Sequence, residues 1–364
     1  MFDNLGPAMR RALAATRAGN PGEATRLIQQ LLGRSGAETP DTPAPQKPPS
    51  RRRKGLGETL DALRPGSVPH GRRSRAEPEI AKGAVFLRKT QQTASGTRDY
   101  RLYVPSSGRP RGLIVMLHGC KQNAEDFAIG TAMNGVAEAE GFMVAYPTQP
   151  QAANPSGCWN WFRPEDQRRE QGEPHIIAEM TRSIIREYAV DEAKVFVAGL
   201  SAGGAMAAVM AATYPELYEA AGIHSGLAHQ SASDVPSAFA AMRGGHHGAR
   251  NAGPLPPRPP RQIVFHGSSD RTVAPHNARV LMDGAQLAHG PIDAVTRQFQ
   301  AGARSVDHIE LRASDGIPKA EVWFIAGAGH HWSGGDPAGS YAKADGPNAS
   351  EEMMRFFLAR VLRV

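Results

Sequence analysis

The chain contains the segment Lys194-Val-Phe-Val-Ala-Gly-Leu-Ser-Ala-Gly-Gly-Ala-Met206, in which an apolar run enters a Gly-x-Ser-x-Gly turn and continues into small residues. This pattern predicts a sharp strand-to-helix turn that projects the Ser201 hydroxyl from the end of a sheet. A β-carbon at Gly199 or Gly203 would clash with neighbouring backbone in such a turn. The segment therefore predicts that Ser201 is a nucleophile.

Short apolar runs alternate with helical periodicity from about Ala81 onward, which is typical of βαβ units around a mostly parallel sheet. Together with the serine turn, the pattern predicts an α/β-hydrolase fold, with the central sheet flanked by helices, over residues 81–364. We expect strands at Leu113–Leu117, Phe142–Tyr146, Val195–Ala198, Ala221–His224, Ile263–His266 and Val322–Ile325, and helices at 124–140, 173–188, 202–213, 275–288 and 350–362. Residues 228–260 show no clear period and are interpreted as an inserted loop or cap.

The N-terminal residues differ in composition from the rest of the chain. Residues 1–33 have the pattern of a short helical hairpin, whereas 34–80 are rich in Pro, Arg, Ser and Gly and are interpreted as a disordered linker. Residues 1–80 hold 14 Lys and Arg against 8 Asp and Glu, which accounts for most of the net charge of +7. We expect weak contact with anionic surfaces but no specific nucleic-acid site, because aromatic interleaving and recognition motifs are missing.

No run approaches the roughly 18 apolar residues of a membrane span. Arg10, Arg11 and Arg17 interrupt the first 20 residues, so no secretory signal is visible and a cytoplasmic location is one expectation. The two cysteines, Cys120 and Cys158, are consistent with two free thiols or with one disulfide, and the residues alone do not choose.

Partners for Ser201 are expected later in the chain, first an acid and then a histidine, each in a loop after a strand. Asp270 follows the strand at Ile263–His266 and would orient the histidine and stabilise its protonated form. His330 and His331 both follow the last predicted strand. We choose His330, which directly follows a glycine, and expect His331 to be a groove or surface residue.

An oxyanion hole needs two backbone N–H groups, one from the residue after the nucleophile and one from the loop after an early strand. Ala202 and Cys120 are the expected donors. We expect His118, His224 and His266, at strand ends, to be structural. No cofactor or metal is expected, because His246 and His247 lack partner ligands at suitable spacing.

Residues 81–364 resemble the polyhydroxybutyrate depolymerase family of esterases, which is related to feruloyl and acetylxylan esterases. The resemblance covers about three quarters of the chain. It rests on linked segments, which are Met116-Leu-His-Gly-Cys-Lys-Gln122, Gly130-Thr-Ala-Met-Asn134, Asn154-Pro-Ser-Gly-Cys-Trp-Asn-Trp-Phe162, Gly199-Leu-Ser-Ala-Gly-Gly-Ala-Met206, His224-Ser-Gly226 and Gly329-His-His-Trp-Ser-Gly-Gly335.

The resemblance implies hydrolysis of short-chain hydroxyalkanoate esters, in polymers or oligomers, through an acyl-enzyme on Ser201. It also implies a disulfide between Cys120 and Cys158 and an extracellular location. Trp159 and Trp332 would flank the active-site groove, although core packing is an equal alternative for Trp159 and for Trp161. The chain departs from extracellular members because it shows no signal peptide and ends without a substrate-binding domain.

Two alternatives remain open at this point. The chain could be a feruloyl or acetylxylan esterase acting on plant-polymer esters. It could instead be a polymer-granule or surface-binding protein whose hydrolase domain is inert, with residues 1–80 as the adhesive part. Three separated triad residues in the expected order argue against inertness, since no binding role requires them.

Overall fold

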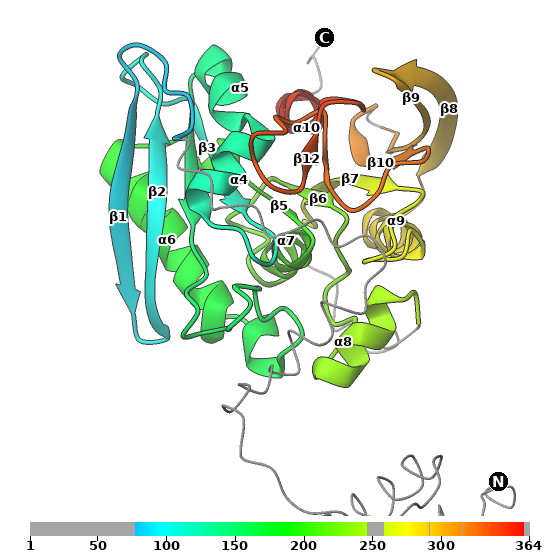
Figure 1. Ribbon diagram of the computed structural model, residues 1–364, viewed down its shortest axis with the longest axis horizontal. Coiled ribbons are helices and arrows are strands. Elements are labelled where there is room, and N and C mark those ends of the chain that lie inside the picture. The colour runs from blue at the N-terminus through cyan, green and yellow to red at the C-terminus, as the bar shows by residue number, and fades with distance from the viewer. Residues whose placement is uncertain (1–76, 246–257, 291, 315, 360–364) are drawn as a thin grey trace, which may run out of the picture. The chain divides into compact units, whose positions relative to one another are not determined.

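A ten-stranded sheet forms the centre of the computed structural model, which describes residues 77–245, 258–290, 292–314 and 316–359 (Figure 1). The strand order is β1-β2-β4-β3-β5-β6-β7-β10-β9-β8. The strands are β1 (Val85–Thr93), β2 (Gly96–Val104), β3 (Gly112–Leu117), β4 (Phe142–Pro147), β5 (Val195–Leu200), β6 (Ala220–His224), β7 (Arg261–Gly267), β8 (Asp293–Ala301), β9 (Arg304–Arg312) and β10 (Pro318–Ile325). A two-residue parallel pair, β11 (Trp332–Ser333) and β12 (Ala342–Lys343), lies outside this sheet.

The middle of the sheet, from β4 to β10, is parallel, and antiparallel strands extend both edges. Strands β3, β4, β5 and β6 are buried along their whole length. A parallel strand covered on both faces has an almost continuous apolar sequence, which is why these runs were recognisable.

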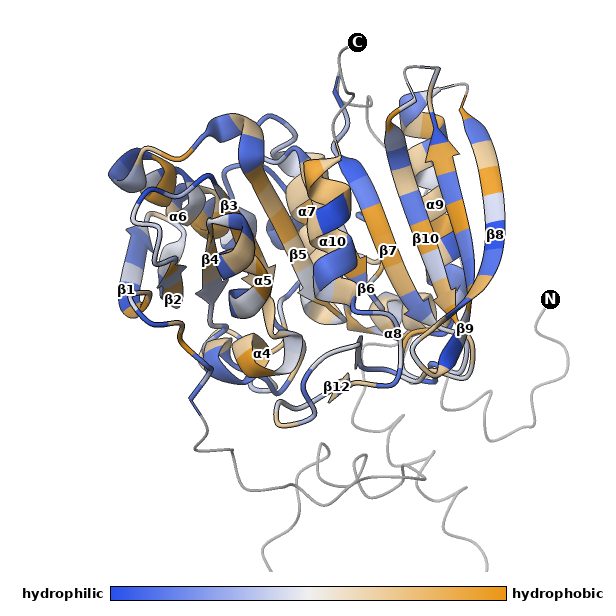
Figure 2. Cartoon of the chain, turned by 90° about the horizontal axis from the view of Figure 1, so that it is seen from above, coloured by the Kyte–Doolittle hydropathy of each residue, from blue (hydrophilic) through white to orange (hydrophobic). Residues whose placement is uncertain are grey.

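Helices cover both faces of the sheet. They are α4 (Ala124–Thr131), α5 (Met133–Glu140), α6 (Gly172–Tyr188), α7 (Ala202–Thr213), α8 (Val235–Met242), α9 (His276–His289) and α10 (Ala349–Leu358), with short 3-10 turns η1 (Pro164–Gln167) and η2 (Glu192–Lys194). Helices α6 and α7 pack on one face, and α4, α5 and α10 on the other. Figure 2 shows β5 mostly in apolar colours, as expected for a strand inside the core.

The six predicted strands and the α/β-hydrolase architecture are confirmed by this arrangement. The helices predicted at 173–188, 202–213 and 275–288 correspond to α6, α7 and α9. The single helix predicted at 124–140 is wrong in one respect, because it divides at Ala132. That residue has φ of 50° and donates its N–H to the carbonyls of Ala128 and Ile129, which ends α4.

Strands β1, β2, β8 and β9 were not predicted. Residues of β8 are almost all exposed, and β1 alternates exposed and half-buried positions, so neither has the apolar run used to find the central strands. The interval 228–260, interpreted as an inserted loop or cap, contains α8, whose first turn is capped by Asp234, and its residues 246–257 lie outside the described part of the chain. The predicted hairpin at 1–33, nearly all of the predicted linker at 34–80 and the histidines 246 and 247 lie outside the described residues.

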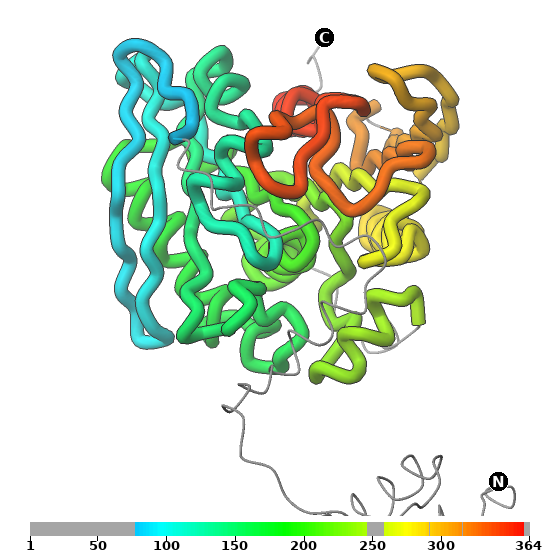
Figure 3. The backbone as a smooth tube through the Cα atoms, in the orientation of Figure 1, coloured from blue at the N-terminus to red at the C-terminus, as the bar shows by residue number. Residues whose placement is uncertain are grey.

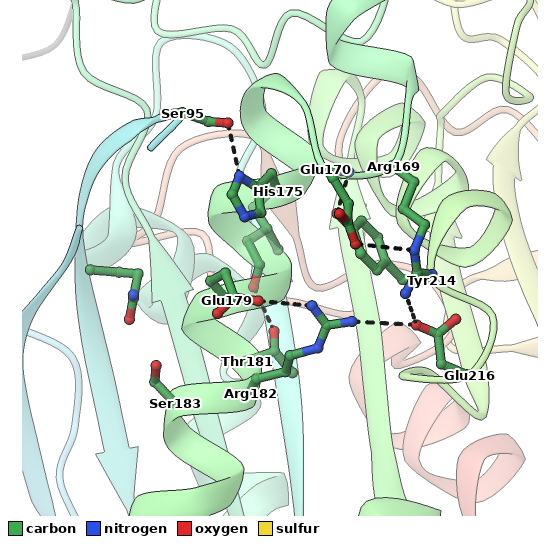
Figure 4. A network of polar contacts seen from close by, with 12 residues as sticks. Ser95, Arg169, Glu170, His175, Glu179, Thr181, Arg182, Ser183, Tyr214 and Glu216 are labelled. Carbon is green, nitrogen blue, oxygen red and sulfur yellow. Dashed lines mark hydrogen bonds and ion pairs between the residues drawn. The ribbon is translucent and has the colours of Figure 1, made fainter. Parts of the chain in front are cut away.

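Helix α6 is fixed at its exposed side by a network of polar contacts, shown in Figure 4. Glu216 accepts hydrogen bonds from both Arg169 and Arg182, at 2.8 and 3.4 Å. Both guanidinium groups lie over the ring of Tyr214, and Tyr214 accepts a hydrogen bond from the Glu170 N–H. The network therefore ties α6 to the end of α7.

In the part of the chain that the structure describes, no helix is long and apolar enough to cross a membrane.

Candidate active site

Ser201 lies at the tip of the turn between β5 and α7, with φ of 58° and ψ of −118°. A β-carbon at Gly199 would stand 2.4 Å from the carbonyl carbon of Gly203, and one at Gly203 would stand 1.9 Å from the carbonyl oxygen of Leu117. The Ser201 N–H donates to the carbonyl of His224 on β6 at 2.9 Å. Close packing of β3, β5 and α7 thus requires both glycines and holds the serine in a backbone conformation that non-glycine residues rarely adopt.

The structure brings Ser201, His330 and Asp270 together as a chain of hydrogen bonds. His330 Nε2 lies 2.8 Å from Ser201 Oγ, and His330 Nδ1 lies 2.7 Å from Asp270 Oδ2. Asp270 follows β7 and His330 follows β10. These two strands are parallel neighbours, so both residues lie beyond the carboxyl ends of adjacent strands. In Figure 3 the segment after β10, coloured orange to red, folds across the front of the sheet.

The carboxylate of Asp270 is buried and held from two sides. Its Oδ1 accepts the N–H groups of Thr272 and Val273, at 2.8 and 2.9 Å, and its Oδ2 faces His330. Burial alone would raise the pKa of Asp270, but the hydrogen bond and charge interaction with His330 and the Val273 N–H lower it below its ordinary value. The group is therefore a carboxylate at neutral pH, and it can fix the His330 tautomer that donates from Nδ1.

The backbone amides of Ala202 and Cys120 were predicted as oxyanion donors. Ala202 is the first residue of α7, so its N–H has no acceptor within the helix. In the loop after β3, the Gly119 N–H donates to Gln122 Oε1, the Lys121 N–H donates to the Ser156 carbonyl, and the Gln122 N–H donates to the Gly119 carbonyl. No acceptor is found for the Cys120 N–H among the described residues. A β-carbon on Gly119 would lie 3.6 Å from the Ser201 β-carbon, so this loop adjoins the serine.

Cys120 and Cys158 form a disulfide, with their Cα atoms 4.2 Å apart. This confirms the pairing that the family resemblance implied. Trp159, next to Cys158, is fully buried and donates from Nε1 to the carbonyl of His118 at 3.1 Å. Trp159 therefore does not flank a groove, and the core-packing alternative holds: its indole supports the Cys120 loop from inside.

Trp332 requires the same correction. Its indole is 1% exposed, stacks on His224 and donates from Nε1 to Ser350 Oγ at 3.2 Å. His331, expected in a groove or on the surface, is also buried, and its Nε2 accepts the Gly329 N–H at 3.3 Å. Both side chains are buried, whereas His330 turns towards Ser201. They position the histidine loop.

Three buried histidines are structural, as predicted. His118 accepts the Gln149 N–H at Nε2, His224 accepts the Ser333 N–H at Nε2, and His266 donates from Nε2 to the carbonyl of Val273. Burial lowers the pKa of all three, to about 4 for His118, so they are neutral at physiological pH.

The polar side chains that hold the Cys120 loop were not predicted from the sequence. Gln122 accepts the Gly119 N–H and donates to the carbonyl of Ser340 at 2.8 Å, which joins this loop to the segment after β11. Gln149 donates to the carbonyl of Cys158 and also contacts Glu173. Gln122 occurs in one of the segments that carried the resemblance, but its spacing alone does not reveal a contact with Ser340, 218 residues away.

The sheet order, the strand-to-helix turn and the position of its serine define the class of α/β-hydrolases. Solved structures support the fold. The acetyl xylan esterase from Aspergillus awamori superposes with a TM-score of 0.59 at 23% identity, covering 75% of this chain and 98% of its own. The S-formylglutathione hydrolase from Agrobacterium tumefaciens superposes with a TM-score of 0.51 at 13% identity, covering 78% and 98%.

Residues 98–307 match the model of the family described as esterase PHB depolymerase, and the chain belongs to that family. It is 34% identical over 272 residues to poly(3-hydroxyalkanoate) depolymerase C of Paucimonas lemoignei, covering 69% of this chain and 63% of that protein. It is 32% identical over 244 residues to feruloyl esterase B of Neurospora crassa, covering 63% and 81%. Acetylxylan esterase A of Talaromyces purpureogenus is 32% identical, covering 50% and 51%. The chain thus spans less than two thirds of the first and third of these relatives.

Proposed function

We propose that this chain is a serine esterase in which Ser201 is the nucleophile, His330 the general base and acid, and Asp270 the group that orients His330. The observation that carries the proposal is the hydrogen-bond chain from Ser201 Oγ through His330 to Asp270, at 2.8 and 2.7 Å. A serine hydroxyl needs an adjacent base to become an effective nucleophile, and that base needs a third group to orient it. Family membership supports the same chemistry.

In the proposed reaction, Ser201 Oγ attacks the ester carbonyl carbon while its proton passes to His330 Nε2. The tetrahedral oxyanion accepts hydrogen bonds from the Cys120 and Ala202 amides. The C–O bond to the alcohol then breaks, and His330 returns the proton to the leaving alkoxide. Water attacks the resulting acyl-enzyme by the same steps, which releases the acid and restores the serine.

We assign short-chain hydroxyalkanoate esters, in polymers or oligomers, as the preferred substrate. The 34% identity to a poly(3-hydroxyalkanoate) depolymerase supports this choice. Feruloyl and acetylxylan esterases are 32% identical and define the alternative, ferulate or acetyl-sugar esters. Rates on hydroxybutyrate oligomers, a feruloyl ester and an acetylated xylo-oligosaccharide, measured side by side, distinguish these. A higher kcat/KM on either plant-type ester would overturn the assignment.

The test of the nucleophile is the Ser201→Ala variant on p-nitrophenyl butyrate. Loss of the hydroxyl should reduce kcat by roughly 10⁶-fold, because removal of the nucleophile of a triad leaves only binding and oxyanion stabilisation. Ser183→Ala on helix α6 is the matched control and should retain full activity. Labelling with a serine-directed phosphonate followed by peptide mapping gives a second measurement. A label on another serine, or activity retained by Ser201→Ala, contradicts the proposal.

We also propose that the protein works in an oxidising compartment outside the cytoplasm. The disulfide between Cys120 and Cys158 supports this, since such bonds persist in oxidising environments. Alkylating free thiols at the moment of cell lysis, with separate analysis of the culture medium, tests it. Recovery of the protein only inside cells with both thiols alkylated would establish the cytoplasmic alternative.

Residues 1–80 are proposed to make the weak contacts with anionic surfaces, because they hold most of the net positive charge. Deletion of this segment should reduce adhesion to anionic vesicles or polymer granules while leaving the esterase rate unchanged. Adhesion that survives the deletion would assign the contact to the remaining chain. A wild-type chain that adheres but hydrolyses no ester would support the inert, surface-binding alternative.

A further inference from the structure

The Cys120 amide depends on a neighbouring segment for its position. Residues Gln149–Asn160 attach to the loop after β3 at several points. The Gln149 N–H donates to His118 Nε2 at 3.0 Å, Trp159 Nε1 donates to the His118 carbonyl, and the Lys121 N–H donates to the Ser156 carbonyl at 2.9 Å. The disulfide adds a covalent link from Cys158 to Cys120 itself. Movement of this segment would therefore move the amide.

The segment has little regular structure of its own. It consists of turns and irregular backbone between β4 and η1, and it includes Pro150, Pro155 and Gly157. Internal hydrogen bonds close its turns, from the Ala153 and Asn154 N–H groups to the Pro150 carbonyl and from the Gly157 N–H to the Asn154 carbonyl. The two ends of the segment, at Gln149 and Asn160, are held by groups from elsewhere in the fold.

One buried carboxylate supplies those contacts at both ends of the segment. Glu173, in the first turn of α6 and 4% exposed, accepts the Asn160 N–H at 2.8 Å and the Asn160 side-chain amide at 2.7 Å. Its Oε1 also contacts Gln149 Nε2, which in turn donates to the Cys158 carbonyl at 2.9 Å. Glu173 thus joins Gln149 to Asn160 and closes the segment into a loop.

The environment of Glu173 accounts for its burial. Arg98 on β2, itself buried, places an Nη atom 3.4 Å from Glu173 Oε1 and lies over the Trp159 ring. All the hydrogen bonds that reach the Glu173 carboxylate come from N–H donors. A buried carboxylate persists when it is paired and hydrogen-bonded in this way. A glutamine at position 173 would place the NH₂ donor of its side chain opposite other N–H donors, with no acceptor between them.

We propose that Glu173 is a positioning residue for ester hydrolysis, which holds the Cys120 amide in the oxyanion hole by fixing Gln149, Asn160 and the segment between them. The inference rests on the proposed function. Glu173 touches neither Ser201 nor His330 in any contact of the described structure, so its effect is transmitted through the disulfide and the His118 contacts.

The charge state of Glu173 gives the proposal a second readout. Burial, and next the neighbouring Asp166 carboxylate, raise the pKa of Glu173 to about 7, against the opposing hydrogen bonds from Asn160 and Gln149. The charged and titratable groups around it are Arg98 from β2, Asp166 from η1 and, through Gln149, His118 after β3. Protonation of Glu173 removes one of the oxygen acceptor sites that the N–H groups of Gln149 and Asn160 use. The segment that holds the Cys120 amide should then loosen, so kcat should fall as the pH drops below about 7.

The experiment compares Glu173→Gln with wild type in the full chain, using p-nitrophenyl butyrate from pH 5 to 9. Loss of one oxyanion donor reduces kcat by roughly 10²–10³-fold. A displaced donor should reduce it about 10- to 100-fold, with little change in KM. The part of the pH dependence that Glu173 contributes should be lost from the kcat profile of this variant, while the dependence that the general base His330 imposes remains. Glu173→Asp, which retains a carboxylate, should recover part of the rate.

Glu321→Gln is the matched control, because Glu321 is also a buried carboxylate bonded to an arginine, Arg355, but it lies on β10 outside this loop. It should lose stability with kcat unchanged. If Glu173→Gln does not fold, Asn160→Ala removes one donor and should still lower kcat. Unchanged kcat and pH profile in a folded Glu173 or Asn160 variant overturn the inference, whereas an inactive wild type or an active Ser201→Ala overturns the esterase proposal itself.

Discussion

Replacement of Gly203 by alanine tests how tightly the serine turn is packed. The added β-carbon would stand 1.9 Å from the Leu117 carbonyl oxygen and 2.5 Å from that of His118. Both atoms belong to backbone, so no side chain can rotate away. Restoring an ordinary contact of about 3.4 Å requires β3 and α7 to separate by about 1.5 Å, and overpacking of this kind costs about 1–3 kcal/mol of unfolding free energy.

The same separation should damage catalysis more than stability. Ser201 and Ala202 precede Gly203 on one side of the contact, and Cys120 follows His118 on the other. The nucleophile and the two proposed oxyanion donors would therefore move apart, and a misplacement of about 1 Å can reduce the rate about 10²-fold. We expect kcat/KM for p-nitrophenyl butyrate to fall by at least that factor.

Urea denaturation followed by circular dichroism measures the stability, and initial rates measure the activity. The control is Gly284→Ala, in the middle of α9, where an added β-carbon meets nothing within 4 Å. That change should raise the unfolding free energy by up to about 1 kcal/mol, because alanine favours the helix, and should leave the rate unchanged. A Gly203→Ala protein with wild-type midpoint and wild-type rate would refute the packing argument.

Three further outcomes are expected. Asp270→Asn should lower kcat by roughly 10⁴-fold with the fold intact, because an amide no longer enforces the productive His330 tautomer; a near-normal rate would exclude the orienting role. Replacing both Cys120 and Cys158 by serine should reduce the unfolding free energy by about 4 kcal/mol, from the 38-residue separation, and an unchanged urea midpoint would contradict this. Burial would raise the pKa of Glu321, but His308 and Arg355 lower it to about 2. Because this pKa lies below the ordinary 4.5, the ionised group stabilises the fold by about 3 kcal/mol above pH 4.5, and that contribution is lost as the pH falls towards 2. The stability difference between wild type and Glu321→Gln should shrink over that range in urea titrations, and a constant difference would disprove the linkage.

Several features of the site were predictable because their causes are local. The conformation at Ser201 follows from a serine between two glycines, with an apolar strand before it and small residues after it. The positions of Asp270 and His330 followed from chain order, since parallel strands bring their carboxyl ends to one edge of a sheet. The structure places both beside Ser201, whereas their catalytic roles stay predictions until the variants are measured.

Features that depend on distant contacts were missed or wrong. The polar strands β1 and β8 form only because a neighbouring strand pairs with them. Trp332 was predicted from the resemblance to line the groove, and Trp159 either to line it or to pack in the core, and the structure places both indoles in the core. A tryptophan beside an active-site loop can face either way, and the sequence holds no signal that decides between them.

The sequence by itself therefore determined the parallel core, the serine turn and the order of the three triad candidates, because apolar periodicity and glycine sterics act over a few residues. Only the tertiary structure decided which side chains hold that turn and its partner loop in place. Glu173 reaches Gln149 and Asn160, and Gln122 reaches Ser340, through contacts between elements far apart in the chain. Such contacts form only when the helices pack on the sheet, because that packing buries the acceptors and brings distant donors within hydrogen-bond distance of them.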